Sequence, residues 1–311
     1  MHKHPESPKA PIPVPKPPLK WTGGKARIIN EIVGRLPVGR RLIEPFVGGA
    51  SVFLASSYDR YLLGDANQHL IDLYRSVVHR FDDLLALTSS YFIEDYRSKE
   101  RYLEVRSAFN RSQDPLERSA QFLYLNRFGF NGLCRYNQSG EYNVPYGKPA
   151  RVPRLPVERL VAFREKAARA TFVAADFITV MRQAVPGDVV YCDPPYLDRD
   201  SAGRSFTGYG ASGFGFDRHR ELASMARTLA AQGVPVLISN HDCEAARSLY
   251  EGAQLFQFEA RRSISADATR RATATELVAF FSPRHEQDER PIPSSFTGLQ
   301  SNLFEESVVV G

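Results

Sequence analysis

Short apolar runs alternate with helical patterns along this chain, and the alternation stops for about a hundred residues before it resumes. The strand-like runs are Arg41–Phe46, Arg60–Asp65, Thr171–Asp176, Asp188–Asp193, Val234–Asn240, Gln254–Ala260 and Glu276–Phe281. Strands that alternate with helices build a sheet whose faces the helices cover. We therefore predict an α/β sheet that is interrupted by an inserted second unit.

The interruption has helical spacing instead of strand-like spacing. Apolar residues recur three or four positions apart at Leu70, Leu73 and Val77, and helical spacing continues to Leu123. A turn-rich stretch, Asn126–Lys148, follows these helices. The predicted organisation is a flexible leader (1–18), a discontinuous sheet unit (19–67 and 169–283), a mainly helical insertion (68–168) and a flexible acidic tail (284–311).

Composition excludes several classes of protein. With 43% hydrophobic residues the chain can bury a large core, yet no apolar run is long enough for a membrane helix. The Pro-rich leader lacks the apolar stretch of a signal peptide, so we expect a cytoplasmic protein. The cysteines, Cys134, Cys192 and Cys243, form no CxxC pair, and the histidines show no ligand spacing. We therefore expect neither a disulfide framework nor a metal site.

The charge is unevenly distributed along the chain. The stretch from Arg97 to Arg169 holds fifteen Lys or Arg against seven Asp or Glu, whereas residues 285–311 hold one Arg against five acids. A basic segment of this kind suits a nucleic-acid partner. A solvated helix face is the alternative interpretation.

Two loops after strands suggest a nucleoside ligand. The first strand runs into Glu44-Pro-Phe-Val-Gly-Gly-Ala-Ser51, where adjacent glycines let the backbone approach a ligand. The second strand ends in Asp65, whose carboxylate can accept hydrogen bonds from two ribose hydroxyls. The alternatives are a simple turn for the first loop and a helix N-cap for Asp65.

The most specific motif is Asp193-Pro-Pro-Tyr196, directly after the apolar strand Val189–Cys192. Two prolines stiffen the turn, so that the Asp193 carboxylate and the Pro194 carbonyl become two acceptors for an amine with two hydrogens. Tyr196 offers an aromatic face on which a flipped base can stack. A rigid turn with a capping aspartate is the alternative.

At these motifs the chain resembles the amino-methyltransferases that act on adenine N6 in DNA. The order Lys20-Trp-Thr-Gly-Gly-Lys25, glycine loop, insertion and Asp-Pro-Pro-Tyr matches the group whose target-recognition domain lies between the cofactor and catalytic motifs. Four further segments are similar to the bacterial and phage Dam-type enzymes of the D12 class, which act on GATC: Leu123–Asn137, Tyr142–Gly147, Val236–Asp242 and Arg261–Ser265. The resemblance covers roughly Leu19 to Pro283.

This resemblance implies a fold and a cofactor site. The fold would be a Rossmann-like S-adenosylmethionine-dependent methyltransferase sheet with a helical target-recognition domain that carries a β-hairpin. The implied contacts to S-adenosylmethionine are Trp21, Lys25, Phe46, Gly48, Gly49, Asp65, Asp176, Phe177 and Asp193. The implied catalytic residues are Asp193, Pro194, Pro195 and Tyr196.

The resemblance also implies a contact surface for duplex DNA. Arg135 resembles a residue that reads guanine, and Leu133 and Pro145 resemble apolar contacts to the thymine methyl, a division that suits the major groove. The further implied DNA contacts are Lys20 to a base, Asn131 and Lys148 to the backbone, and Phe130 as a wedge beside the flipped adenine.

Together these residues predict a monomeric, nucleoid-associated enzyme that methylates adenine N6 by base flipping and direct displacement. Cys192 lies beside the catalytic motif, but we expect it to be a core residue. Two alternatives stay open at this stage: an amino-methyltransferase acting on cytosine N4 or on RNA, and a non-catalytic DNA-binding relative.

The tail contains a separate motif, Gln300-Ser-Asn-Leu-Phe304, which resembles the peptide by which bacterial replication and repair proteins bind the sliding clamp. A flexible segment can place Leu303 and Phe304 in an apolar pocket while Gln300 supplies a polar anchor. The alternatives are packing on the enzyme's own surface and a chance match.

We predict that a peptide spanning residues 295–307 binds the clamp weakly. Changing Leu303→Ala and Phe304→Ala together should remove this binding without altering methylation of a short free duplex. Calorimetry and a methyl-transfer assay measure the two effects. Absence of binding at high micromolar concentration, or loss of stability in the double variant, would assign the tail a structural role.

Overall fold

A computed structural model describes residues 15–25, 28–197, 214–260 and 274–283 of the chain. The clamp-like motif, the Arg261–Ser265 segment, the acidic tail and most of the leader lie outside these residues. None of the described helices is long and apolar enough to span a membrane.

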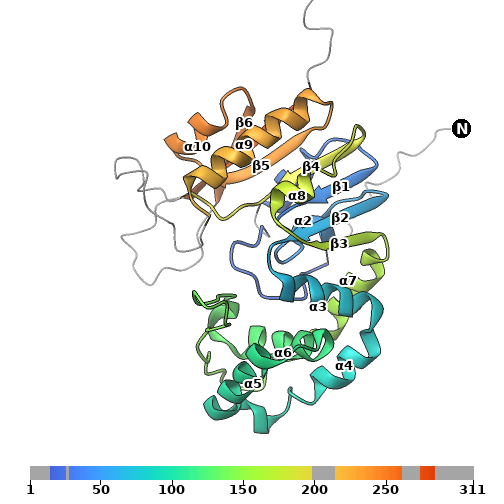
Figure 1. Cartoon of the computed structure of the whole chain (residues 1–311), viewed down its shortest axis with the longest axis vertical. Coiled ribbons are helices and arrows are strands. Elements are labelled where there is room, and N and C mark those ends of the chain that lie inside the picture. The colour runs from blue at the N-terminus through green and yellow to red at the C-terminus, as the bar shows by residue number, and fades with distance from the viewer. Residues whose placement is uncertain (1–14, 26–27, 198–213, 261–273, 284–311) are drawn as a thin grey trace, which may run out of the picture.

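The centre of the molecule is a sheet that contains seven strands within the described residues (Figure 1). The strands are β1 (Arg41–Glu44), β2 (Arg60–Asp65), β3 (Ala170–Ala174), β4 (Asp188–Cys192), β5 (Val236–His241), β6 (Gln254–Ala260) and β7 (Ala274–Phe281). Their order is β3-β2-β1-β4-β5-β7-β6. The pairings are parallel except for the two that β7 makes, with β5 and with β6. This is the Rossmann order with an antiparallel strand added between the last two positions, which confirms the predicted fold class.

The strands are apolar because both faces of the sheet are buried. Successive residues point to opposite faces, so Leu42 joins one hydrophobic cluster while Ile43 joins the other. The same alternation separates Tyr191 from Cys192 in β4. Helices cover both faces of the sheet: α1 (Ile29–Val33), α2 (Ser51–Ala55), α8 (Phe177–Met181), α9 (Phe216–Ala231) and α10 (Glu244–Leu249).

The insertion is mainly helical, as predicted, and occupies the lower half of Figure 1. Its helices are α3 (Gln68–His79), α4 (Phe81–Ser89), α5 (Lys99–Arg111), α6 (Pro115–Phe128) and α7 (Val157–Ala167), with short 3₁₀ turns at Glu94–Arg97 and Phe130–Gly132. The turn-rich stretch folds back on itself through two isolated antiparallel bridges, Gly129–Tyr146 and Tyr136–Tyr142. The hairpin expected there is therefore short and irregular.

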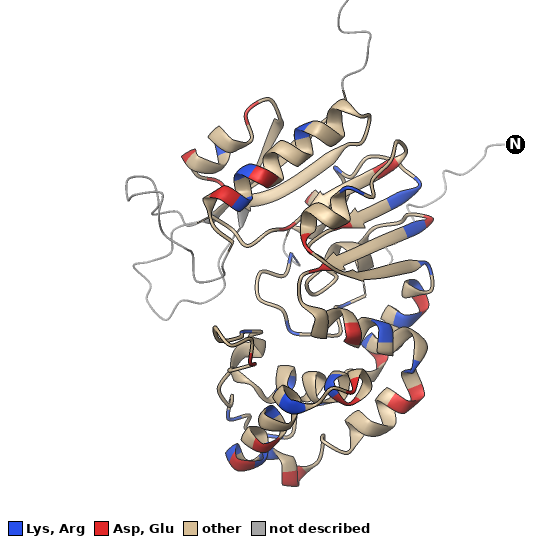
Figure 2. Cartoon of the chain, viewed as in Figure 1, with Lys and Arg blue, Asp and Glu red and all other residues tan. Residues whose placement is uncertain are grey.

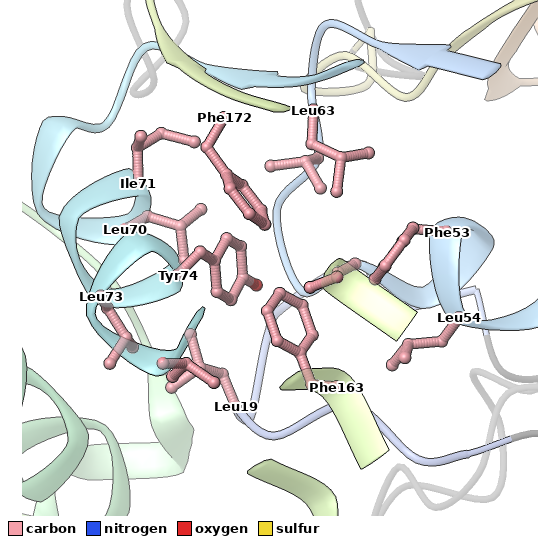
Figure 3. Close-up of a cluster of buried hydrophobic side chains, with 14 of the residues drawn as sticks. Leu19, Phe53, Leu54, Leu63, Leu70, Ile71, Leu73, Tyr74, Phe163 and Phe172 are labelled. Atoms are coloured by element: carbon pink, nitrogen blue, oxygen red, sulfur yellow. The ribbon is translucent and has the colours of Figure 1, made fainter. Parts of the chain in front are cut away.

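One hydrophobic cluster runs without a break from the sheet into the insertion. Tyr74 of α3 stacks on Phe163 of α7 with ring centroids 4.6 Å apart, and Phe172 of β3 lies against both rings (Figure 3). Leu19, from the leader side of the chain, is buried in the same cluster. The insertion is consequently packed onto the sheet and shares its core.

A buried asparagine ties the start of the described chain to the insertion. Asn126 of α6 accepts a hydrogen bond from the Lys20 backbone N–H (2.9 Å) and donates one to the Lys20 carbonyl (2.8 Å). Arg127 donates to the Pro18 carbonyl at 2.6 Å. The segment that leads into Trp21 is thus held by the insertion through main-chain hydrogen bonds.

We predict that Asn126→Ala lowers the free energy of unfolding by about 1–3 kcal/mol, because two partly buried backbone groups of Lys20 lose their partner. Chemical denaturation of the full chain measures the change. Gln183→Ala, which removes an exposed amide in the turn after α8, is the control and should leave stability unchanged within about 0.5 kcal/mol. Equal stability of the two variants would mean that water replaces Asn126.

Candidate active site

The residues singled out in the sequence gather at the carboxyl ends of β1, β2 and β4. In the observed strand order, β1 and β4 are neighbours whose connections run in opposite directions along the sheet. Such a switch point leaves a crevice beyond the strand ends, where open α/β sheets bind their ligands. The loops after Glu44, Asp65 and Cys192 all lie at this end of the sheet.

The glycine loop after β1 is in close contact with Trp21. A Cβ atom on Gly48 would lie 2.7 Å from the Trp21 indole nitrogen, and one on Gly49 would lie 2.8 Å from the Trp21 Cβ. Gly48 also has a positive φ of 44°, which disfavours other residues. Both glycines are therefore required for the indole to lie against the loop.

Asp65 stabilises the same loop. Its two carboxylate oxygens accept hydrogen bonds from the backbone N–H groups of Gly48 (3.0 Å) and Asn67 (2.9 Å). Burial raises the pKa of Asp65, and these two donors offset part of that increase. The N-cap of α3 is Asn67, whose side chain accepts from the His69 and Leu70 amides, so the capping alternative for Asp65 is excluded.

The turn Asp193-Pro-Pro-Tyr196 follows β4 and is joined to the segment that carries Trp21. The Lys25 ammonium lies 2.7 Å from Asp193 Oδ1 and donates to the Gly23 carbonyl at 2.7 Å. It also lies 4.7 Å from the centre of the Tyr196 ring. The lysine side chain is only 6% exposed, so this ion pair is largely shielded from water.

Tyr196 is held in place by residues that the sequence did not single out. Its hydroxyl donates to Glu276 Oε2 of β7 at 3.1 Å, and its ring meets the His241 ring edge to face at 4.8 Å. Burial, followed by the nearby Asp193 charge, raises the pKa of Tyr196 well above its ordinary value. Asp193 is held in a similar way, because the hydroxyl of Ser239, a buried residue of β5, donates a hydrogen bond to it.

An aromatic group lies beside the glycine loop. The rings of Phe46 and Phe177 stack at 5.3 Å, and Phe214 meets Phe46 edge to face at 5.6 Å. Asp176 caps α8 through the Ile178 amide at 3.0 Å and forms an ion pair with Arg218. Phe46 is thus brought together with Asp176 and Phe177, which lie about 130 positions further along the chain.

His219 is fully buried next to Pro195 of the Asp193-Pro-Pro-Tyr196 turn. Burial lowers its pKa to about 4, and the nearby Pro195 carbonyl offsets only part of this effect. Neither imidazole nitrogen has a hydrogen-bond partner of good geometry. His219 is therefore neutral and packs against Phe214 at 4.8 Å.

The residues expected to contact DNA lie in the turn-rich loop after α6. Phe130 donates its N–H to the Pro145 carbonyl (2.9 Å), and its side chain is 48% exposed. Arg135 donates from Nε to the Asn143 side-chain oxygen at 2.8 Å and points away from the core. Asn131 and Lys148 both have a positive φ, of 52° and 50°, so the backbone is locally strained where they lie.

Lys20 joins this loop from the start of the described chain. A Cβ atom on Gly132 would lie 2.3 Å from the Lys20 Cβ, so the Lys20 side chain packs closely on the Gly132 backbone next to Leu133. Burial, followed by repulsion from Arg127, lowers the pKa of Lys20. All of the residues expected to contact DNA therefore belong to this loop or touch it.

Part of the basic excess of the insertion is neutralised locally. Lys and Arg alternate with Asp and Glu along its outer helices (Figure 2). Arg80 pairs with Asp83, and Arg101 pairs with Asp95 and Glu104. The solvated-face interpretation thus holds for these helices, and the loop after α6 is the better candidate for a DNA contact.

The cysteines and acids offer no metal centre in the described part of the chain, where no group of three or more His, Cys, Asp or Glu could hold an ion. Cys192 is fully buried in the core, and burial raises the pKa of its thiol well above the ordinary value. A thiol of this kind is a poor nucleophile.

A glycine loop, a strand-terminal aspartate and a proline-stiffened carboxylate at one switch point define a nucleoside-binding enzyme of the Rossmann class. The chain belongs to the D12 class N6 adenine-specific DNA methyltransferase family, which it matches over residues 21–264. Membership of this family makes it an adenine-specific DNA methyltransferase.

Curated relatives match this chain over most of its length. It is 44% identical over 266 residues to the DNA adenine methylase of Vibrio cholerae, covering 85% of this chain and 95% of that protein. The Serratia marcescens protein of the same name is 44% identical, covering 85% and 97%. That of Escherichia coli K12 is 43% identical, covering 85% and 95%.

Solved structures are more distant. The delta-N METTL16 MTase domain has a TM-score of 0.36 at 10% identity, covering 83% of this chain and 79% of that one. The putative methyltransferase yhhF from Escherichia coli has a TM-score of 0.35 at 8% identity, covering 86% and 92%. Similarity at this level has no bearing on function.

Proposed function

We propose that the enzyme transfers the methyl group of S-adenosylmethionine to the N6 of adenine in duplex DNA, within GATC. The observation that carries the proposal is the position of Asp193, which pairs with Lys25 next to the glycine loop and Trp21. This arrangement puts an acceptor for the amine beside a pocket suited to a nucleoside.

The pocket fits S-adenosylmethionine on chemical grounds. Two backbone donors hold Asp65 at the end of β2, where a carboxylate can bind ribose hydroxyls. The Phe46 and Phe177 rings supply an aromatic wall for the adenine end. When bound, the cofactor supplies an electrophilic methyl group on a sulfonium. The proposed contacts are Trp21, Lys25, Phe46, Gly48, Gly49, Asp65, Asp176, Phe177 and Asp193.

The residues of the turn act on the amine of the target base. The adenine amine is a poor nucleophile because its lone pair is delocalised into the ring. Asp193 and the Pro194 carbonyl accept its two hydrogens and favour tetrahedral geometry at nitrogen. Pro195 stiffens the turn, and the Tyr196 ring stacks on the base once the base has left the helix. Positioning then suffices for in-line displacement, without a covalent enzyme intermediate.

Recognition of the target is assigned to the loop after α6. Arg135 pairs with guanine, Leu133 and Pro145 contact the thymine methyl, and Lys20 contacts a further base. Asn131 and Lys148 hold the phosphate backbone. The exposed Phe130 ring fills the space that the flipped adenine leaves.

We further propose the domain boundaries given above, with the insertion at residues 68–168 as the target-recognition domain. Binding to the bacterial sliding clamp through Gln300, Leu303 and Phe304 would direct the enzyme to newly copied DNA.

The first test concerns the catalytic turn. Asp193→Ala should reduce methyl transfer to a GATC duplex by orders of magnitude, whereas DNA binding, dominated by phosphate contacts, persists. A tritiated-methyl assay and a binding titration measure the two. The control is Asp59→Ala, an exposed carboxylate before β2, which should retain full activity. Near-normal turnover of Asp193→Ala would remove Asp193 from the mechanism.

The second test concerns sequence choice. Arg135→Ala should cost about 1–3 kcal/mol of discrimination at one base pair, because a bidentate contact to guanine is lost. Competition between cognate and single-substituted duplexes measures this. Arg151→Ala, an exposed cation outside the loop, is the control and should weaken binding to all duplexes equally. Equal losses on every duplex for Arg135→Ala would make Arg135 a phosphate contact.

A further inference from the structure

Two donors hold the same oxygen of the Asp193 carboxylate. Lys25 Nζ lies 2.7 Å from Oδ1, and the Ser239 hydroxyl donates to Oδ1 at 3.0 Å. Within the part of the chain that the structure describes, no group binds Oδ2. The two donors on Oδ1 restrict rotation of the carboxylate, and the hydrogen bonds among the described residues leave Oδ2 for another donor.

The position of Ser239 follows from the sheet. Strands β4 and β5 are parallel neighbours with Cys192 opposite Ile238, so the next residues, Asp193 and Ser239, are adjacent across the strands. Ser239 is completely buried, and its hydroxyl lies between the strand β4 and the turn that follows it. A hydroxyl in such a place must have partners, because an unpaired buried polar group is costly.

The direction of the hydrogen bonds is determined by what each group can do. An ionised carboxylate only accepts, so Ser239 donates its single proton to Asp193. The Ser239 oxygen can then accept from the Tyr191 hydroxyl, 3.0 Å away. Tyr191 is itself buried in β4. A chain of hydrogen bonds thus runs from Tyr191 through Ser239 to Asp193.

We propose that Ser239, supported by Tyr191, is a positioning residue that fixes the Asp193 carboxylate so that Oδ2 receives one hydrogen of the target amine. The inference rests on the proposed role of Asp193. It assigns a function in the reaction to a β5 residue that touches neither the cofactor nor the base. The serine and the lysine have different roles, since Lys25 also contacts the Tyr196 ring and the Trp21 segment.

The test is the steady-state kinetics of Ser239→Ala. We expect kcat to fall by roughly tenfold to a hundredfold, the effect of losing a hydrogen bond to a charged group. The KM values for duplex and for S-adenosylmethionine should stay within about twofold, because the interaction orients a group that acts in the transition state. Ser239→Cys should be intermediate, since a thiol is a weaker donor.

A matched control is available elsewhere in the chain. Ser119 is a buried serine of α6 whose hydroxyl lies 3.1 Å from that of Ser76. Ser119→Ala removes the same atoms from a similar environment and should leave kcat unchanged. A comparable fall in kcat for Ser119→Ala would mean that loss of any buried hydroxyl impairs the enzyme, and would overturn the assignment.

Two further variants keep the proposal falsifiable if Ser239→Ala folds poorly. Tyr191→Phe preserves the ring and should lower kcat less than Ser239→Ala does. In the Asp193→Ala background, Ser239→Ala should have no further effect on residual transfer, because the two residues act as one unit. Full turnover of Ser239→Ala or of Tyr191→Phe, or additive losses in the double variant, would refute the role of the hydrogen bonds from Tyr191 through Ser239 to Asp193. Near-normal activity of Asp193→Ala would instead remove Asp193 itself from the proposed mechanism.

Discussion

The ion pair between Lys25 and Asp193 connects parts of the chain that are otherwise remote. Asp193 belongs to the turn after β4, whereas Lys25 ends the segment that Asn126 holds against the insertion. The lysine side chain is 6% exposed and the aspartate side chain 24% exposed, so the pair lies largely out of water where it joins the two segments. The position of Trp21 on the glycine loop depends on this pair at one end and on the Asn126 hydrogen bonds at the other.

The shared core makes the rest of this arrangement rigid. The hydrophobic cluster on one face of the sheet continues through α3 and α7 into the insertion. A separate cluster on the other face holds α8, α9 and α10. The turn that contains Asp193 leaves β4 between these clusters, because Tyr191 points into one and Cys192 into the other. The turn therefore starts from a strand that packing holds on both sides.

Much of the sheet was predictable because strands such as β1, β2 and β4 are largely apolar runs with chemically distinctive residues at or after their carboxyl ends. The predicted starts of β1 and β2 agree with the structure, and Asp193 follows β4 as expected. The hairpin of the insertion was harder to predict, since its two isolated bridges, Gly129–Tyr146 and Tyr136–Tyr142, show no strand periodicity, and of their tyrosines only Tyr142 is buried.

The supporting residues of the site could not be found from the sequence. Ser239 and Glu276 lie in strands that read as ordinary apolar runs, and their partners are 46 and 80 positions away. A polar residue inside such a run was the available signal, because a buried hydroxyl or carboxylate needs a partner. Asn126, at the end of a helix with no polar face of its own, carried the same signal.

The contact between Gly132 and Lys20 has a consequence for how such enzymes can be recombined. The Lys20 side chain lies so close to the Gly132 backbone that any side chain at position 132 would collide with it. Residues 18–25 and the loop after α6 are therefore one interlocked structural unit, although more than a hundred positions separate them. A chimera that takes only the insertion from a relative of different specificity would join mismatched halves of this unit. Residues 18–25 have to be transplanted together with the insertion.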